Sequence, residues 1–246
     1  MIDVGERMVF DQEDWQKKDT ASTVSRHVLP SLKALGVRHI DGIFITHGDY
    51  DHMGGLEELA AEYPIDRIYL PIGMAQATDK LTSIKQIAQN NSAHSQITWV
   101  KTGDHWELGP TTYLQVLAPN DLGSGNNEDS LVMWGKFGPH SILLTGDADG
   151  KGESQTMTEL ERLDLDVDIL KVAHHGSDHS TSAAYITAVD PNYAWISVGA
   201  NNRYGHPADR VLADLQETGT RIMRTDQMGG VYYHFTQNSA KIKLTA

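Results

Sequence analysis

Two histidines and two aspartates fall within six positions of the stretch "THGDYDHMGG". His47, Asp49, Asp51 and His52 follow a short apolar run and precede a pair of glycines. Neutral imidazole and carboxylate are ligands for Zn²⁺, Mn²⁺ or Fe²⁺, and a loop after a strand can fold them around one or two ions. A polar turn with a helix cap is the simpler alternative, but a cap requires only one such side chain. We therefore expect a metal-binding loop.

Further candidates follow later predicted strands. Asp147 stands in "LLTGDAD", His174 and His175 in "KVAHHGS", and His206 in "NNRYGHP". In α/β sheets the ligand crevice lies outside the carboxyl ends of the strands, so these segments are expected to meet the first loop at one place. His206 could hold substrate oxyanions or could be an ordinary turn histidine.

The elements that must position these residues alternate along the chain. Apolar periodicity predicts strands bounded by turn residues and amphipathic helices between them, which favours one α/β unit. The expected strands cover 40–46, 67–70, 97–101, 112–117, 131–134, 141–145, 167–172, 194–198, 221–224 and 230–236, and the expected helices cover 24–35, 55–62, 80–89, 153–163, 183–189 and 208–217.

Composition limits the chemistry. The 246 residues carry a formal net charge of −13 and no cysteine, so disulfides and thiolate metal sites are excluded. An anionic substrate would have to be attracted locally, by metal ions aided by Lys171 and Arg203. No apolar run approaches the ~20 residues of a membrane-spanning helix, which predicts a soluble polypeptide as given. The opening residues 1–5 read like the end of a strand, so we expect a fragment of a longer protein.

With these residues assembled, the sequence resembles the metallo-β-lactamase superfamily and, within it, the C-terminal domains of the ComEC family of competence DNA-uptake proteins. The likeness rests on "IDVG", "VLPSLKALGVRHIDGIFITHGDYDHMGGL", "NNEDSLVMW", "ILLTGDAD", "DILKVAHHGSDHSTS" and "NRYGHPADRVL", in that order. It implies an α/β metallo-β-lactamase fold, a four-layer αββα sandwich with the site at the carboxyl ends of the strands. Residues 1–246 would form a single domain of a larger membrane protein, with the first strands missing.

The resemblance also implies the ligands of two divalent metal ions. His47 and Asp49 match ligands of the first ion, and Asp51 and His52 match ligands of the second. Asp147 matches the bridging carboxylate. One of the tandem histidines closes the site; His175 is favoured for the metal, and His174 for contact with the substrate or leaving group.

Two departures from the family pattern affect the first ion. Asp49 stands where the family loop has a histidine, and Asn126 stands where another histidine is expected. Because both changes replace imidazole by oxygen donors, Mn²⁺ is favoured and Zn²⁺ remains possible. No small organic cofactor is expected.

The function implied is that of a metal-dependent DNase that degrades one DNA strand during uptake in natural transformation. Asp51 would orient the attacking water, and His174 or His206 would stabilise or protonate the leaving oxygen. The partners would be DNA and a membrane channel domain of the same protein, on the extracytoplasmic face of a bacterial cell membrane. Two alternatives stay open: a small-molecule phosphodiesterase or phosphorylcholine-type esterase of the same fold, and a catalytically degenerate domain that binds DNA or a partner.

Overall fold

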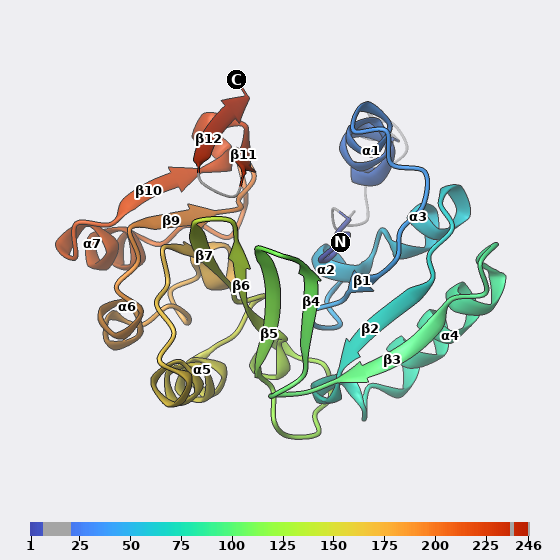
Figure 1. Ribbon diagram of the computed structural model, residues 1–246, viewed down its shortest axis with the longest axis horizontal. Helices are drawn as coiled ribbons and strands as arrows, with labels where there is room; N and C mark the ends of the chain where they lie inside the picture. Colours follow the sequence, from blue (N-terminus) through green and yellow to red (C-terminus); the bar gives the residue numbers. More distant parts are fainter. Residues whose placement is uncertain (7–20, 237–238, 246) are drawn as a thin grey trace. The chain divides into compact units, whose positions relative to one another are not determined.

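The computed structural model describes residues 1–6, 21–236 and 239–245 (Figure 1). The chain forms two compact units. The first comprises Met1–Val100 with Leu122–Asn126, and the second comprises Lys101–Asp121 with Asn127–Ala246. Each unit has its own sheet and its own hydrophobic core, and strands alternate with helices in both. The expected α/β class is confirmed.

The first unit is built on a short parallel sheet in the order β1-β2-β3. Its strands are β1 (Ile43–Phe44), β2 (Arg67–Pro71) and β3 (Gln96–Val100). The residues Met1–Gly5 run beside β1, with a parallel bridge between Ile2 and Phe44 and a hydrogen bond from Asp3 N to Phe44 O (2.8 Å). This amino-terminal segment therefore lies at the edge from which the ligand loop emerges.

Helices of the first unit bury their apolar faces in one core. They are a π-helix (Val24–Val28), α1 (Leu29–Ala34), α2 (Tyr50–Met53), α3 (Leu56–Glu62) and α4 (Thr78–Asn90), with a 3₁₀ turn at Ile72–Met74. Pro30 lies in the first turn of α1, directly after the π-helix. Gly36 ends that helix at φ +71°, the left-handed conformation that glycine adopts without steric strain.

The second unit contains a seven-stranded sheet in the order β10-β9-β8-β7-β6-β5-β4. The strands β4 (His105–Gly109), β5 (Thr112–Ala118), β6 (Val132–Phe137) and β7 (His140–Leu144) form an antiparallel meander. The strands β8 (Ile169–Lys171), β9 (Tyr193–Ile196) and β10 (Arg221–Arg224) continue it parallel to β7. The carboxyl ends of β7, β8 and β9 therefore lie at one edge of this sheet.

Three helices connect the parallel strands and line one face of the sheet in Figure 1. They are α5 (Gly150–Leu163), α6 (Ala183–Val189) and α7 (Asp209–Glu217). Their buried side chains, such as Leu160, Ile186 and Leu215, fill two adjoining clusters with the strand residues. Each such side chain stabilises the fold by about 1.5–3 kcal/mol, so the sheet edge is held by a rigid core.

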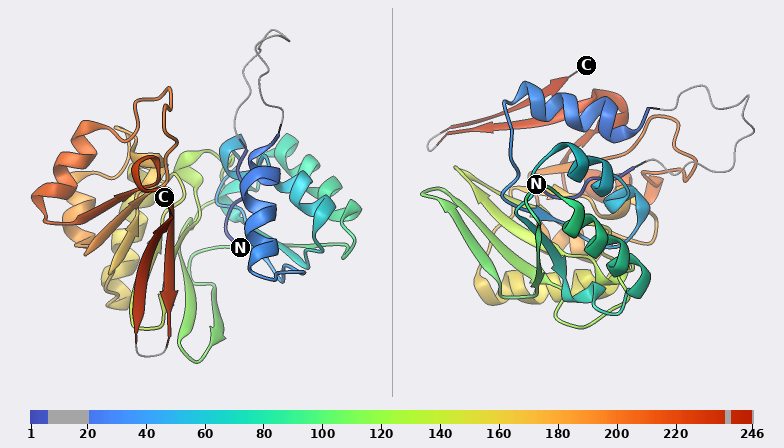
Figure 2. Two further views of the ribbon diagram at one scale, coloured as in Figure 1. Left: turned by 90° about the horizontal axis from the view of Figure 1, so that it is seen from above. Right: turned by 90° about the vertical axis from the view of Figure 1, so that its right-hand side faces the viewer.

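The last two described strands form a separate β-hairpin, which Figure 2 shows beside the larger sheet of the same unit. It follows α8 (Thr225–Met228) and pairs β11 (Gly230–Phe235) with β12 (Ala240–Thr245). Phe235 packs edge-on against Phe137, with ring centroids 5.9 Å apart. Across the described ranges, no helix combines the length and the apolar character needed to cross a membrane.

The structure differs most from the sequence expectations at three strands. The strand expected over 40–46 is reduced to β1, because ladder pairing with β2 involves only Ile43 and Phe44. Neither β4 nor β12 was expected. β4 is an edge strand whose side chains are mostly exposed, so it lacks the apolar alternation by which strands are found in a sequence.

Candidate metal centre

The loop after β1 carries the four ligand candidates of the first unit. His47 and His52 are buried, and their ring centroids lie 4.2 Å apart. Nε2 of His47 lies 3.8 Å from Oδ2 of Asp49. Asp51 lies exposed in the first turn of α2. Asp49 precedes α2 without making a side-chain capping hydrogen bond, so the alternative of a helix cap does not account for its carboxylate.

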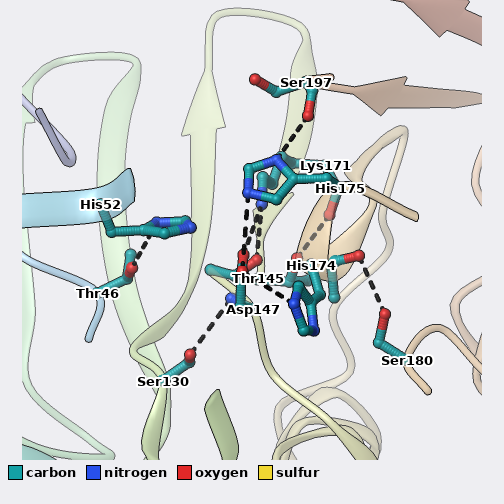
Figure 3. A network of polar contacts seen from close by, with 12 residues as sticks. Thr46, His52, Ser130, Thr145, Asp147, Lys171, His174, His175, Ser180 and Ser197 are labelled. Atoms are coloured by element: carbon teal, nitrogen blue, oxygen red, sulfur yellow. Dashed lines mark hydrogen bonds and ion pairs between the residues drawn. The ribbon is translucent and has the colours of Figure 1, made fainter. Parts of the chain in front are cut away.

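Asp3, which sequence reasoning did not identify, fixes the orientation of both imidazoles. Its carboxylate accepts hydrogen bonds from Thr46 N (2.8 Å), Thr46 Oγ1 (2.8 Å) and His52 Nδ1 (2.7 Å). Because a carboxylate only accepts, His52 must carry its proton on Nδ1, and the lone pair of its neutral ring then lies on Nε2, the atom by which such histidines ligate a metal. Figure 3 shows Thr46 beside the His52 ring.

The same network sets the tautomer of His47. Since the hydroxyl proton of Thr46 is donated to Asp3, Thr46 Oγ1 accepts from His47 Nδ1 (3.1 Å). His47 therefore also presents its Nε2 lone pair. Two imidazoles with fixed tautomers and two nearby carboxylates fit the donor chemistry of a divalent ion. In the sequence, Asp3 is part of the motif "IDVG", which by itself is weak evidence for the family and gave Asp3 no role.

A lysine from α4 reaches the same loop. Nζ of Lys80 lies 3.2 Å from Asp49 Oδ1 and 3.2 Å from Gly125 O. Gly48 makes room for this side chain, because a Cβ at that position would overlap Cδ, Cε and Nζ of Lys80. Sequence reasoning missed Lys80, which lies 31 positions after Asp49 and has no local signal.

In the second unit, Asp147 follows β7 and is buried (Figure 3). Its backbone N–H donates to Ser130 Oγ (3.2 Å), and its carboxylate lies 3.6 Å from Lys171 Nζ. Lys171 also donates to Gly146 O at 2.6 Å. Its ammonium, which was expected to attract substrate, therefore hydrogen-bonds the backbone that follows β7. Asp149 caps α5 by accepting from Lys151 N (3.2 Å).

The tandem histidines after β8 adopt a backbone that is rare outside glycine. His174 (φ +48°) and His175 (φ +55°) are both left-handed, a conformation that costs about 1–2 kcal/mol per residue. Such strain persists only where surrounding contacts fix the backbone, and it clusters at functional sites. Here His174 N donates to Gly146 O (3.3 Å), and His175 Nδ1 donates to Ser197 O (2.6 Å).

The two rings differ in the groups that their nitrogens contact. Because Nδ1 of His175 donates to a carbonyl, its Nε2 presents a lone pair, 3.7 Å from Asp147 Oδ2 (Figure 3). Nδ2 of Asn127 lies 3.2 Å from Nδ1 and 3.5 Å from Nε2 of His174, so this contact does not select one tautomer. Nε2 of His174 lies 3.8 Å from the same Asp147 oxygen. His175 is thus suited to ligate a metal, and His174 lies beside it.

His206 lies beside His174 in the same unit, with ring centroids 5.7 Å apart. Its backbone is clamped by Asn202, whose side chain accepts from His206 N (3.0 Å) and donates to His206 O (2.7 Å). Burial and then the nearby imidazoles of His174 and His175 lower the pKa of His206, against the opposing effect of Asp147. The ring is therefore neutral near pH 7, and it can exchange hydrogen bonds without adding charge.

Each unit thus presents imidazole and carboxylate donors at the carboxyl end of its strands. Residues 1–200 match the family model described as the metallo-β-lactamase superfamily, and the chain belongs to that superfamily. The superfamily binds divalent metal ions and consists generally of metal-dependent hydrolases.

Within this superfamily, the chain is similar to two proteins with known names. The chain is 36% identical over 238 residues to ComE operon protein 3 of Bacillus subtilis (strain 168), and 28% identical over 223 residues to competence protein ComA of Neisseria gonorrhoeae. These matches cover 96% and 90% of this chain but only 30% and 29% of the relatives. The chain therefore spans less than a third of their length.

Solved structures agree on the fold. CmlA, a diiron β-hydroxylase from Streptomyces venezuelae, matches with a TM-score of 0.54 and 14% identity, over 85% of this chain and 45% of that protein. This likeness concerns the fold alone, and the expected metallo-β-lactamase fold is confirmed. The order of the four expected layers and the single domain over 1–246 stay predictions.

Proposed function

We propose that this chain is a metal-dependent phosphodiesterase that cleaves DNA and degrades one strand during uptake in natural transformation. The observation that carries the proposal is the matched pair His52 and His175. Each donates Nδ1–H to a fixed oxygen and presents Nε2 as a lone pair, the arrangement found in metal-ligating histidines. Two relatives bear names from the competence system, which supports the DNA-uptake context.

The proposed ligands follow the family resemblance. The residues Asp51, His52, Asp147 and His175 would hold the essential divalent ion, with His47 and Asp49 at the position of the first ion and Asp147 bridging. At the first position Mn²⁺ is proposed over Zn²⁺ because oxygen donors replace imidazole at Asp49 and Asn126. At the second position the carboxylates of Asp51 and Asp147 are oxygen donors that also suit Mn²⁺. A divalent ion held by these residues would polarise the phosphate and activate water.

The remaining roles fall to three side chains. His174, whose Nε2 lies 3.8 Å from Asp147 Oδ2, would donate a proton to the leaving oxygen. His206, neutral and next to His174, would hydrogen-bond a phosphate oxygen. The exposed carboxylate of Asp51 would orient the attacking water as well as ligate. By resemblance, the whole protein would carry this activity on the extracytoplasmic face of a bacterial membrane, next to its own channel domain.

Cleavage of labelled linear DNA with Mn²⁺, with Zn²⁺ or with a chelator tests the proposal. We expect cleavage with Mn²⁺, weaker cleavage with Zn²⁺ and none with the chelator. The variants Asp51→Ala and His175→Ala should each lose cleavage at least 100-fold while circular dichroism stays unchanged. Asp79→Ala, at an exposed position on α4, serves as the matched control.

The same assay separates the alternatives. Hydrolysis of bis(p-nitrophenyl) phosphate without DNA cleavage would identify a small-molecule phosphodiesterase, and hydrolysis of a phosphorylcholine ester alone would identify an esterase. Binding of DNA without cleavage under any metal would identify a degenerate domain. Activity that survives in either ligand variant would refute the assigned roles.

A further inference from the structure

The ligand loop of the first unit already holds a positive charge. Nζ of Lys80 lies between Asp49 Oδ1 and Gly125 O, at 3.2 Å from each. The Lys80 and Asp49 side chains are only 32% and 44% exposed, and Gly48 lacks the Cβ that would displace the lysine. Three separate segments therefore define the position of this ammonium: the loop after β1, the helix α4 and residues 122–126.

This position is the one that the family pattern reserves for the first metal ion, because Asp49 stands where the family has an imidazole ligand. An ammonium has three N–H donors and no lone pair, so Lys80 cannot act as a ligand and instead repels a cation at the same carboxylate. With Asp49 engaged by Lys80 and an amide at Asn126, His47 is the one imidazole left for that ion. The residues present at the first position therefore do not fit a divalent ion.

We propose that the Lys80 ammonium takes the place of the first metal ion, so that the chain binds one divalent ion instead of two. The inference rests on the proposed function, since the single ion is the one held by the second set of ligands. Two of the three Lys80 donors point at Asp49 and Gly125, and the third serves an anionic phosphate oxygen. Lys80 thus contributes to substrate binding as a fixed charge that chelators cannot remove.

The number of metal ions bound per chain tests the Lys80 inference directly. The chain is loaded with Mn²⁺, freed of excess metal by gel filtration and analysed by inductively coupled plasma mass spectrometry and electron paramagnetic resonance. We expect one Mn²⁺ per wild-type chain, with the spectrum of an isolated ion. The triple variant Lys80→Ala, Asp49→His and Asn126→His removes the ammonium and restores both imidazoles of the family pattern, and it should bind two ions with an exchange-coupled spectrum. Lys85→Ala, at an exposed position on the same helix, should bind one.

Two results overturn the inference: two ions per wild-type chain, or one ion in a triple variant that circular dichroism shows to be folded. Cleavage of DNA is scored separately. One ion per chain without DNA cleavage refutes the proposed function and leaves the Lys80 inference standing. DNA cleavage with two ions per chain refutes the Lys80 inference and leaves the proposed function standing. A wild-type chain that binds no Mn²⁺ refutes both.

Discussion

The carboxylate of Asp3 offers a test of how metal affinity depends on a residue that touches no metal. In the Asp3→Asn variant, Oδ1 can still accept from Thr46 N, but an amide N–H replaces the oxygen that accepts from His52 Nδ1. The amide donates, so His52 must move its proton from Nδ1 to Nε2. The ring then turns a proton toward the metal position where it previously presented a lone pair.

The size of the effect follows from the hydrogen bonds that the substitution weakens. Loss of an oriented carboxylate partner typically lowers metal affinity 10- to 100-fold, which corresponds to ~1.4–2.8 kcal/mol. Two charge-assisted hydrogen bonds, from Thr46 Oγ1 and His52 Nδ1, become neutral ones, and neutral bonds are roughly half as strong. We therefore expect a further loss of about 1–2 kcal/mol in the free energy of unfolding.

Mn²⁺ affinity is measured by electron paramagnetic resonance titration, the His52 tautomer by ¹⁵N nuclear magnetic resonance, and stability by thermal unfolding. Asp79→Asn, at an exposed position on α4, is the control and should match the wild type in all three measurements. Wild-type affinity in Asp3→Asn, or a His52 that keeps its proton on Nδ1, would refute the reasoning.

Three further predictions concern the second unit. His174→Ala should slow DNA cleavage about 100-fold while Mn²⁺ affinity stays unchanged; a loss of affinity in a titration would show that His174 is the ligand. Burial raises the pKa of Asp168, but hydrogen bonds from Ser141 and the charges of His140 and Lys136 hold the pKa below its usual value. Because this folded pKa lies below the unfolded one, Asp168 stabilises the fold above pH ~4 and loses that contribution as the pH falls through the folded value. The difference in melting temperature between wild type and Asp168→Asn should therefore shrink from pH 6 to pH 3. A constant difference would contradict this. Gly176 has φ +85° and a Cβ there would overlap Pro207, so Gly176→Ala should lower the free energy of unfolding by about 2–3 kcal/mol. Gly150→Ala should not lower it, because a Cβ at that position meets nothing within 4 Å. Equal melting temperatures for the two variants would refute the steric explanation.

Local patterns in the sequence were sufficient to predict most elements. The helix α6 (Ala183–Val189) and the strand β10 (Arg221–Arg224) begin and end where apolar periodicity placed them. Periodicity is a local property and is written directly in the side chains. The edge strand β4 could not be found in this way, because its side chains are mostly exposed and only its pairing with β5 defines it.

The candidate ligands were also readable from residue type and order. His47, Asp51, His52 and Asp147 each follow a predicted strand, and the family resemblance assigns them roles that stay predictions. Residue type could not separate His174 from His175, since the two differ in what their ring nitrogens contact. Those contacts come from Asn127 and from the carbonyl of Ser197, which approach the histidines only in the folded chain.

By itself the sequence determined which ligand chemistry is available, because a chain without cysteine offers no thiolate, and histidine and carboxylate are then its strong ligands for a divalent ion. The tertiary structure alone decided what those ligands contact. Asp3 reaches His52 across 49 positions and Lys80 reaches Asp49 across 31, and neither separation has a period or a motif that a sequence could reveal. Such contacts arise when strand pairing and helix packing bring distant segments together, and they set both the direction of each lone pair and the charge beside it.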